Sequence, residues 1–251
     1  MDTMKNNASD LLKELKLPIF ISNFEAMEKK ASKDNWSYEQ FLKELCLCEL
    51  DHRKEVKTEN LLKQSKIPPQ YTLDGLDQKL LSTKVRGALA SLLKGEFVST
   101  GSNVLAFGLP GRGKSHLLGA LGRELILRYN LSVYFTSTFK IVEKLLIAKK
   151  EFELENTLKK LDRFDVIILD DIGYVQQSRE EMEVLFTLLA DRYERKSLMI
   201  SSNLVFSKWD QIFKDPMTTM AAVDRLVHHS TILEFTWESI RAKEAKSKNI
   251  N

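Results

Sequence analysis

Residues 108–115 are Gly108-Leu109-Pro110-Gly111-Arg112-Gly113-Lys114-Ser115, which fit the phosphate-binding pattern G-x-x-x-x-G-K-[ST]. The apolar run 104–107 precedes them and has the length of a buried parallel strand. Leucines recur at helical spacing over 117–125, directly after the loop. A strand, a glycine-rich turn and a helix start leave backbone N–H groups pointing into one concavity, where the helix dipole favours an anion. The stretch therefore predicts a nucleotide site rather than a turn that binds nothing.

Each part of this loop has an expected contact with a nucleoside triphosphate. We expect Lys114 to reach the β- and γ-phosphates and the Ser115 hydroxyl to bind Mg²⁺. The loop from Gly108 to Ser115, with His116 at the helix start, is expected to hold the phosphates, through the backbone N–H groups of its residues other than Pro110. The predicted ligands are ATP or GTP, together with Mg²⁺.

Composition limits the class of protein. With 251 residues, 43% hydrophobic and 29% charged, the chain is expected to form one sizeable globular domain with a small appendage. No apolar run approaches the roughly 20 residues needed to span a bilayer, so no membrane contact is expected. The first residues lack a hydrophobic signal core, which predicts a cytoplasmic protein. The net charge of +3 permits nucleic-acid binding but does not demonstrate it.

Residues 1–66 are predicted to form a small all-helical domain. Ser9 is the expected cap of a first short helix that stops before Pro18, and a second helix is expected over 20–33. The third is expected to begin at Ser37-Tyr38-Glu39-Gln40, a capping box. Pro68-Pro69 then breaks the helical pattern, so the second domain is placed at 67–251.

The third helix carries a local excess of positive charge and two cysteines. Cys46 and Cys48 would point to different sides of a helix, and without a second ligand pair elsewhere no zinc site is expected here. The basic residues could contact a phosphate backbone or form a solvated helix face, and both interpretations stay open. The residues considered for DNA contact in this region are Arg53, Lys54 and Lys57.

Beyond Pro69 the pattern alternates between strand and helix, which predicts a parallel α/β sheet of five strands. One helix is expected to start at the capping box Ser178-Arg179-Glu180-Glu181. The expected strands are 104–107, 131–135, 166–169, 198–202 and 231–235.

Polar side chains end two of these strands. Asp170 and Asp171 follow the apolar run 166–169, and Asn203 follows 198–202. Beside a phosphate-binding loop, Asp170 is the expected Mg²⁺ ligand, and Asp171 is expected to polarise the attacking water. Asn203 is expected to orient that water or sense the γ-phosphate, because its amide both donates and accepts hydrogen bonds.

Arg225 is predicted to act in the active site of a neighbouring subunit, where a guanidinium neutralises charge on the departing phosphate. An intramolecular pair with a carboxylate such as Asp224 is the alternative. Arg195, just before the Asn203 strand, is the rival candidate for the same role.

Four motifs now stand in a fixed order: GLPGRGKS, VIILDD, ISSN and AVDRL. That order resembles the AAA+ ATPases of the branch containing the replicative initiator DnaA and the helicase loader DnaC. Within this branch the chain is similar to the IstB-like transposition helper ATPases over nearly its whole length. The stretches LKELKLP, SYEQFL, DIGY and RYERKS support this closer resemblance.

The resemblance implies an ATPase that assembles into homo-oligomers on duplex DNA, with ATP sites between subunits, and works with a separate transposase. It assigns the nucleotide roles to Lys114, Ser115, Asp170, Asp171 and Asn203, and the finger that acts in trans to Arg225. Asp171 stands where many AAA+ proteins have Glu, so slow hydrolysis is expected. The chain ends 16 residues after Phe235, so no C-terminal lid domain is expected, although Arg241 could supply the arginine that the lid usually carries.

The resemblance also places nucleic-acid contacts after the second strand, although a solvated helix face explains the same basic residues equally well. A helicase loader with the same core is the main alternative function, and a monomeric metabolic kinase is a second one. The residues considered for DNA contact after the second strand are Lys140, Lys144, Lys149 and Lys150.

Overall fold

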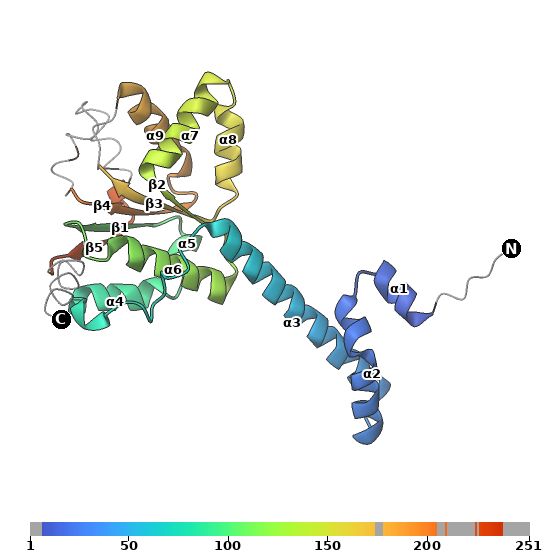
Figure 1. Ribbon diagram of the computed structural model, residues 1–251. Helices are drawn as coiled ribbons and strands as arrows, with labels where there is room; N and C mark the ends of the chain where they lie inside the picture. The colour runs from blue at the N-terminus through green and yellow to red at the C-terminus, as the bar shows by residue number, and fades with distance from the viewer. Residues whose placement is uncertain (1–6, 174–177, 205–208, 210–223, 225, 238–251) are drawn as a thin grey trace, which may run out of the picture. The chain divides into compact units, whose positions relative to one another are not determined.

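A computed structural model describes residues 7–173, 178–204, 209, 224 and 226–237 (Figure 1). By its internal contacts the chain separates into two compact units, 1–60 and 61–251. The boundary falls within the long helix α3 (Tyr38–Ser65), whose last residues belong to the second unit. Neither α3 nor any other described helix is long and apolar enough to cross a membrane.

The first unit consists of α1 (Ala8–Glu14), α2 (Pro18–Lys33) and most of α3. The rings of Phe24 and Phe41 join α2 to α3 in an edge-to-face contact, with centroids 5.6 Å apart. Glu49 on α3 accepts a hydrogen bond from the backbone N–H of Ile19 at the start of α2. The predicted helices are thus present, and the aromatic pair and the buried Glu49 carboxylate join α2 to α3.

Two of the expected helix starts were wrong. Asn7, not Ser9, caps α1, because its side chain accepts the Asp10 N–H at 2.9 Å. The second helix begins at Pro18 rather than at residue 20, because the first turn of a helix tolerates a residue without an N–H. At the third helix, Ser37 accepts the Gln40 N–H as predicted.

The second unit is a parallel five-stranded sheet with helices on both faces, as predicted (Figure 1). The strands are β1 (Asn103–Gly108), β2 (Val133–Ser137), β3 (Val166–Ile172), β4 (Ser197–Ser202) and β5 (Ser230–Phe235). The helical segments are η1 (Gln78–Leu80), α4 (Thr83–Leu92), α5 (Glu96–Ser99), α6 (Lys114–Tyr129), α7 (Thr138–Lys150), α8 (Leu154–Asp162) and α9 (Arg179–Arg192).

The strand order is β2-β3-β4-β1-β5, so β4 separates β3 from β1. Helices α7, α8 and α9 cover one face, and α4 and α6 cover the other (Figure 1). Successive residues of a strand point to opposite faces. Leu105 and Phe107 accordingly pack in the core beneath α7, α8 and α9, and Val104 and Ala106 pack in the core beneath α4 and α6. Both faces of β1 are therefore buried, which explains its uninterrupted apolar sequence.

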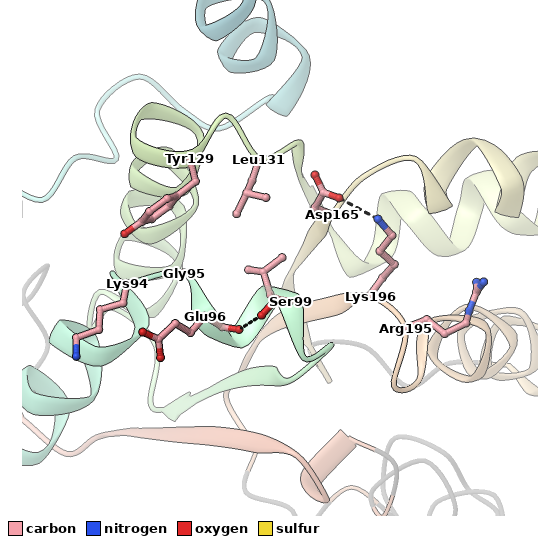
Figure 2. A pocket seen from close by; sticks show the side chains of 10 residues that line it. Lys94, Gly95, Glu96, Ser99, Tyr129, Leu131, Asp165, Arg195 and Lys196 are labelled. Carbon is pink, nitrogen blue, oxygen red and sulfur yellow. Dashed lines mark hydrogen bonds and ion pairs between the residues drawn. The ribbon is translucent and has the colours of Figure 1, made fainter.

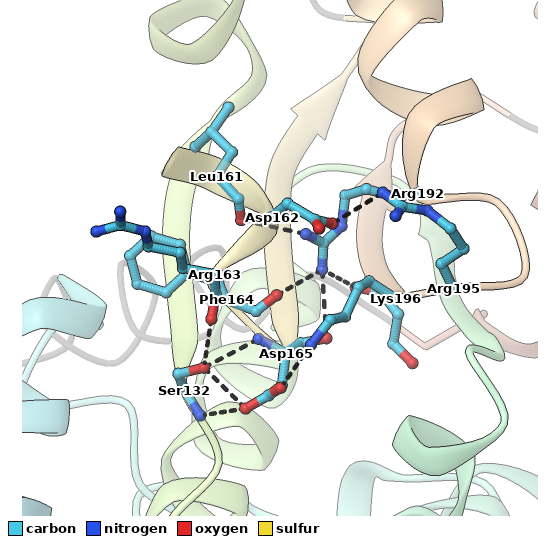
Figure 3. Close-up of polar contacts among 10 residues, drawn as sticks. Ser132, Leu161, Asp162, Arg163, Phe164, Asp165, Arg192, Arg195 and Lys196 are labelled. Carbon is cyan, nitrogen blue, oxygen red and sulfur yellow. Dashed lines mark hydrogen bonds and ion pairs between the residues drawn. The ribbon is translucent and has the colours of Figure 1, made fainter. Parts of the chain in front are cut away.

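The second strand begins at Val133, two residues later than expected. Ser132, just before this strand, donates two hydrogen bonds to the Asp165 carboxylate, from its N–H at 2.9 Å and from its hydroxyl at 2.8 Å. Lys196 pairs with the same carboxylate at 2.9 Å (Figure 3). Burial acts to raise the pKa of Asp165, but the bonds from Lys196 and Ser132 outweigh it and hold that pKa below its usual range.

The Asp165–Lys196 pair lines a cavity of about 460 Å³ at the amino edge of the sheet (Figure 2). Its other walls come from the turn between α4 and α5 and from the end of α6, where Tyr129 lies. The phosphate-binding loop follows the carboxyl end of β1, so this cavity is separate from the candidate nucleotide site.

Arg192, the last residue of α9, is almost completely buried beside this edge. Its guanidinium donates to four backbone carbonyls, and Figure 3 shows three of them, on Leu161, Phe164 and Asp165, around it. Burial lowers the pKa of Arg192 to about 10, so the group remains charged at neutral pH. It ties the end of α8 to the starts of β3 and β4. The acceptors are Leu161 at 3.2 Å, Phe164 at 2.9 Å, Asp165 at 3.2 Å and Ser197 at 3.3 Å.

The variant Arg192→Met is expected to lower the free energy of unfolding by about 3 kcal/mol, because buried carbonyls lose a charged donor. Urea unfolding measures this. Arg195→Met is the matched control, since Arg195 is half exposed and pairs with Asp162 and Asp191 at the surface. Its expected cost is under about 1 kcal/mol. Equal reductions in the two variants would contradict the structural role of Arg192.

Candidate nucleotide-binding site

The phosphate-binding loop joins β1 to α6 as predicted. Gly113 caps the helix with φ 87°, a backbone conformation that glycine adopts readily. Gly108 is required for a different reason: a Cβ atom there would lie 2.5 Å from the Phe235 carbonyl oxygen on β5. The Arg112 guanidinium donates to that same oxygen at 2.6 Å, so the loop is anchored to the end of β5.

Lys114 is the first member of a line of hydrogen bonds that crosses the ends of three strands. Its buried ammonium donates to the carbonyls of Gly108 (2.6 Å) and Leu109 (3.1 Å). It also donates to the Asn203 side-chain oxygen at 2.9 Å, and the Asn203 amide nitrogen donates to Asp171 at 2.8 Å. The residues predicted from three separate motifs are thus in contact.

Strand order explains why Asn203 occupies the middle of this line. It follows β4, which lies between β1 with the loop and β3 with the aspartates. The carboxyl ends of parallel strands meet at one edge of the sheet, where ligands bind in open α/β folds. A side chain at the end of β4 therefore reaches both Lys114 and Asp171.

The two aspartates lie on an irregular part of β3. Between Leu169 and Ile172 the strand advances by three residues while its partner advances by two, from Ile200 to Ser202. This bulge gives Asp171 a φ of 62°, which is uncommon for a residue other than glycine. The strained backbone presents the Asp171 carboxylate to the end of β4, which is typical of functional sites.

Ser201 holds this bulge in place, a role that its position in the sequence did not suggest. Its buried hydroxyl accepts the Asp171 N–H at 2.8 Å and donates to the Asp170 carboxylate at 2.6 Å. On the other side, the Thr138 hydroxyl at the start of α7 donates to the Asp170 carbonyl oxygen at 3.1 Å. The available signal for Ser201 was that it follows the apolar run 198–200 directly, before the end of the strand.

The surroundings of Asp171 raise the pKa of its carboxyl group. Burial raises the pKa of Asp171, and the nearby Asp170 carboxylate raises it further, while Lys114 opposes both effects. The carboxylate is therefore a stronger base than an exposed aspartate.

The oxygen donors expected for Mg²⁺ suit a hard cation. They are the Ser115 hydroxyl in the first turn of α6 and the Asp170 carboxylate near the end of β3, both at the carboxyl edge of the sheet. A cavity of about 440 Å³ opens beside the loop, bordered by Leu109, Arg112 and Asn203. Its volume lies within the usual range of small-molecule sites, about 300–1,000 Å³.

Comparison with known proteins places the chain in a family. The family described as IstB-like ATP binding protein matches residues 10–248. The chain belongs to this family. An insertion-sequence ATP-binding protein of Sinorhizobium fredii is 39% identical over 236 residues, covering 94% of this chain and 79% of that protein. The IS21 ATP-binding protein of Pseudomonas aeruginosa is 36% identical over 243 residues, covering 96% and 90%. The resemblance drawn from the motifs is confirmed.

Solved structures with the same fold include the crystal structure of the DnaC helicase loader. Its TM-score is 0.57 at 20% identity, covering 67% of this chain and all of that one. The AMPPCP-bound DnaA from Aquifex aeolicus matches with a TM-score of 0.55 at 18% identity, covering 72% and 56%. These likenesses confirm the predicted fold of the second unit. After β5 the described residues comprise only Thr236 and Trp237.

Not every predicted site residue of this IstB-like chain joins the line of contacts. The His116 side chain stacks on Tyr71, with ring centroids 5.0 Å apart, and its Nε2 lies 2.9 Å from the Thr72 carbonyl oxygen. Its backbone remains at the start of α6. Arg225 lies outside the described residues, as does Arg241. Arg195, the rival candidate for the role of Arg225, forms ion pairs with Asp162 and Asp191 of the same chain.

The basic residues considered for DNA contact differ in how they are engaged. Lys140, Lys144 and Lys150 on α7 are exposed, whereas Lys149 pairs with Glu183 of α9 at 2.9 Å. On α3, Arg53 binds Glu49 and the Lys16 carbonyl oxygen, and Lys54 lies 3.7 Å from Asp51. Lys57 is exposed.

Proposed function

We propose that the protein is an ATP-dependent, DNA-binding helper of insertion-sequence transposition. In this proposal it assembles into oligomers on duplex DNA, presents that DNA to a transposase and hydrolyses ATP as a switch. The observation that carries the proposal is the contact line Lys114–Asn203–Asp171 at the phosphate-binding loop. The names of its relatives, which are insertion-sequence ATP-binding proteins, support the biological setting.

In the proposed hydrolysis, each residue of the line has a distinct task. Lys114 would turn from the loop carbonyls to the β- and γ-phosphates. Ser115 and Asp170 would hold Mg²⁺, which would neutralise phosphate charge. Asn203 orients the attacking water, and Asp171 accepts its proton. Asp171 has a shorter side chain than the glutamate of many AAA+ proteins, and Asn203 already occupies one of its oxygens. Hydrolysis is therefore proposed to be slow until assembly or a partner adjusts this geometry.

Arg225 is proposed to enter the site of the adjacent subunit, so that ATP lies between protomers. Assembly then depends on nucleotide. Sedimentation velocity of the full chain with ATP, Mg²⁺ and duplex DNA tests this: we expect oligomers that require both ligands. A chain that remains monomeric under every condition contradicts the proposal and favours a P-loop kinase.

A helicase loader with the same core is the alternative, and the fold similarity to DnaC is the observation that favours it. Co-precipitation with purified transposase and, separately, with a replicative helicase distinguishes the two functions. Capture of the helicase alone would replace the transposition proposal with the loader.

The exposed lysines of α7 provide a test of DNA binding. The double variant Lys140→Ala, Lys144→Ala is expected to weaken duplex binding. The slope of the logarithm of the binding constant against the logarithm of the salt concentration should become shallower by about 1 for each phosphate that the protein no longer neutralises. Fluorescence anisotropy over a range of salt concentrations measures both. Lys159→Ala is the control, since Lys159 pairs with Glu155 on α8. An unchanged affinity and slope in the double variant would show that these lysines form only a solvated face.

A further inference from the structure

Three potential metal ligands converge at the amino edge of the sheet, away from the nucleotide site. Glu194 lies in the turn between α9 and β4, and His228 and His229 directly precede β5. One ligand atom from each lies within 4.8 Å of the others. Glu194 Oε1 is 3.6 Å from His229 Nε2 and 4.0 Å from His228 Nδ1. All three side chains are exposed, so a solvated ion can reach them.

We propose that Glu194, His228 and His229 form a binding site for a transition-metal dication of the zinc class. A carboxylate oxygen and two imidazole nitrogens all offer lone pairs, and one cation between them satisfies all three. Imidazole favours zinc and its neighbours over Mg²⁺ or Ca²⁺. With three protein ligands, a fourth tetrahedral position remains for water or for a donor from another molecule.

The distances suit such an ion. Zinc bonds of about 2.0–2.2 Å in a tetrahedron place neighbouring ligand atoms about 3.4 Å apart. The separations of Glu194 Oε1 from the two imidazole nitrogens exceed this by a few tenths of an ångström, and exposed side chains can close that gap by small rotations. Tyr193 Oη lies 3.4 Å from His228 Nδ1, so the metal displaces this hydroxyl from the ring nitrogen.

The backbone beneath the ligands is fixed by one buried residue, Asn103 at the start of β1. Its side chain accepts the Leu198 N–H at 2.9 Å and donates to the Leu226 carbonyl oxygen at 3.4 Å. Its own N–H donates to the His229 carbonyl oxygen at 2.8 Å. Glu194 itself has a φ of 55°. The segment that carries the histidines and Leu198 near the start of β4, four residues after Glu194, are therefore held to β1 before any ion binds, which favours a preorganised metal site.

Metal binding would join the turn after α9 to the segment that follows Arg225 in the sequence. The histidines stand three and four positions after that arginine. The ion would act as a cross-link at the base of the segment that carries the proposed trans-acting residue. This goes beyond the proposed ATPase function and does not depend on it.

Isothermal titration of the full chain with Zn²⁺ tests the site, using protein without a histidine tag. Cys46→Ser and Cys48→Ser remove the competing thiols in every sample. We expect one Zn²⁺ per chain, and at least tenfold weaker binding in Glu194→Gln and in His229→Ala. His52→Ala, which lies in the first unit, and Tyr193→Phe are the controls that keep binding.

Thermal unfolding gives a second readout. Zn²⁺ is expected to raise the melting temperature of the background protein and to leave that of His229→Ala unchanged. Circular dichroism confirms that each variant is folded, and Mg-ATP binding is expected to be the same in all of them. The site would be overturned if the background protein did not bind zinc, or if Glu194→Gln and His229→Ala bound it as tightly as the background protein does.

Discussion

Replacement of Lys114 by alanine is expected to weaken Mg-ATP binding by about 100-fold. The ammonium that is removed makes charge-assisted hydrogen bonds to phosphate oxygens, each worth about 1.5–3 kcal/mol, and 100-fold corresponds to about 2.7 kcal/mol. The variant should still fold, because the partners of Lys114 that lose a hydrogen bond include the exposed Leu109 and the partly exposed Gly108 and Asn203. Isothermal titration with a non-hydrolysable ATP analogue measures the change in affinity.

Lys160→Ala provides the control for this experiment, since Lys160 is an exposed residue of α8 remote from the loop. It should bind the analogue as the unsubstituted protein does. Nucleotide-dependent assembly should disappear with Lys114→Ala alone. If Lys114→Ala bound the analogue within a factor of a few of the control, Lys114 would not be the phosphate ligand.

Asp171→Asn is expected to slow hydrolysis by about 100- to 1,000-fold while Mg-ATP binding is kept, because general-base catalysis contributes about 10²–10⁴-fold. The amide retains the shape of the carboxylate and its contact with Asn203 but cannot accept the proton. Single-turnover hydrolysis with saturating ATP and DNA isolates this step. A variant that hydrolyses at the original rate would assign the base to another group.

The pH dependence of ATP hydrolysis is expected to follow the ionisation of Asp171. A carboxylate acts as a base only when ionised, so activity falls as the pH drops through the pKa of Asp171. Because burial and Asp170 raise that pKa, the acid limb of kcat/KM should lie above the usual aspartate value of about 3.9. The acid limb should be absent from any residual activity of Asp171→Asn.

Much of the fold and site could be predicted because the signals are local. The loop 108–115 specifies its own strand–turn–helix unit, and Asp170, Asp171 and Asn203 lie at or just after the ends of the strands β3 and β4. Once the strands are parallel, their polar ends share one edge. The direct contact of Lys114 with Asn203 follows from that arrangement.

What the sequence did not reveal depends on contacts between distant segments. The role of Ser201 requires the bulge in β3, which is a property of strand register and not of either strand alone. Arg192 stands in a helical pattern like any charged residue, and only the packed structure shows the carbonyls that surround it. Glu194 and the two histidines are 34 or more residues apart in sequence, so spacing could not connect them.

Mg-ATP binding and single-turnover hydrolysis, measured side by side in the unsubstituted chain, Lys114→Ala and Asp171→Asn, test the nucleotide site as a whole. We predict that the first protein binds and hydrolyses, that the second binds about 100-fold more weakly, and that the third keeps binding while its hydrolysis slows by about 100- to 1,000-fold. An unsubstituted chain that fails to bind Mg-ATP, or a folded Asp171→Asn variant that loses binding as fully as Lys114→Ala, would contradict the roles proposed for these residues.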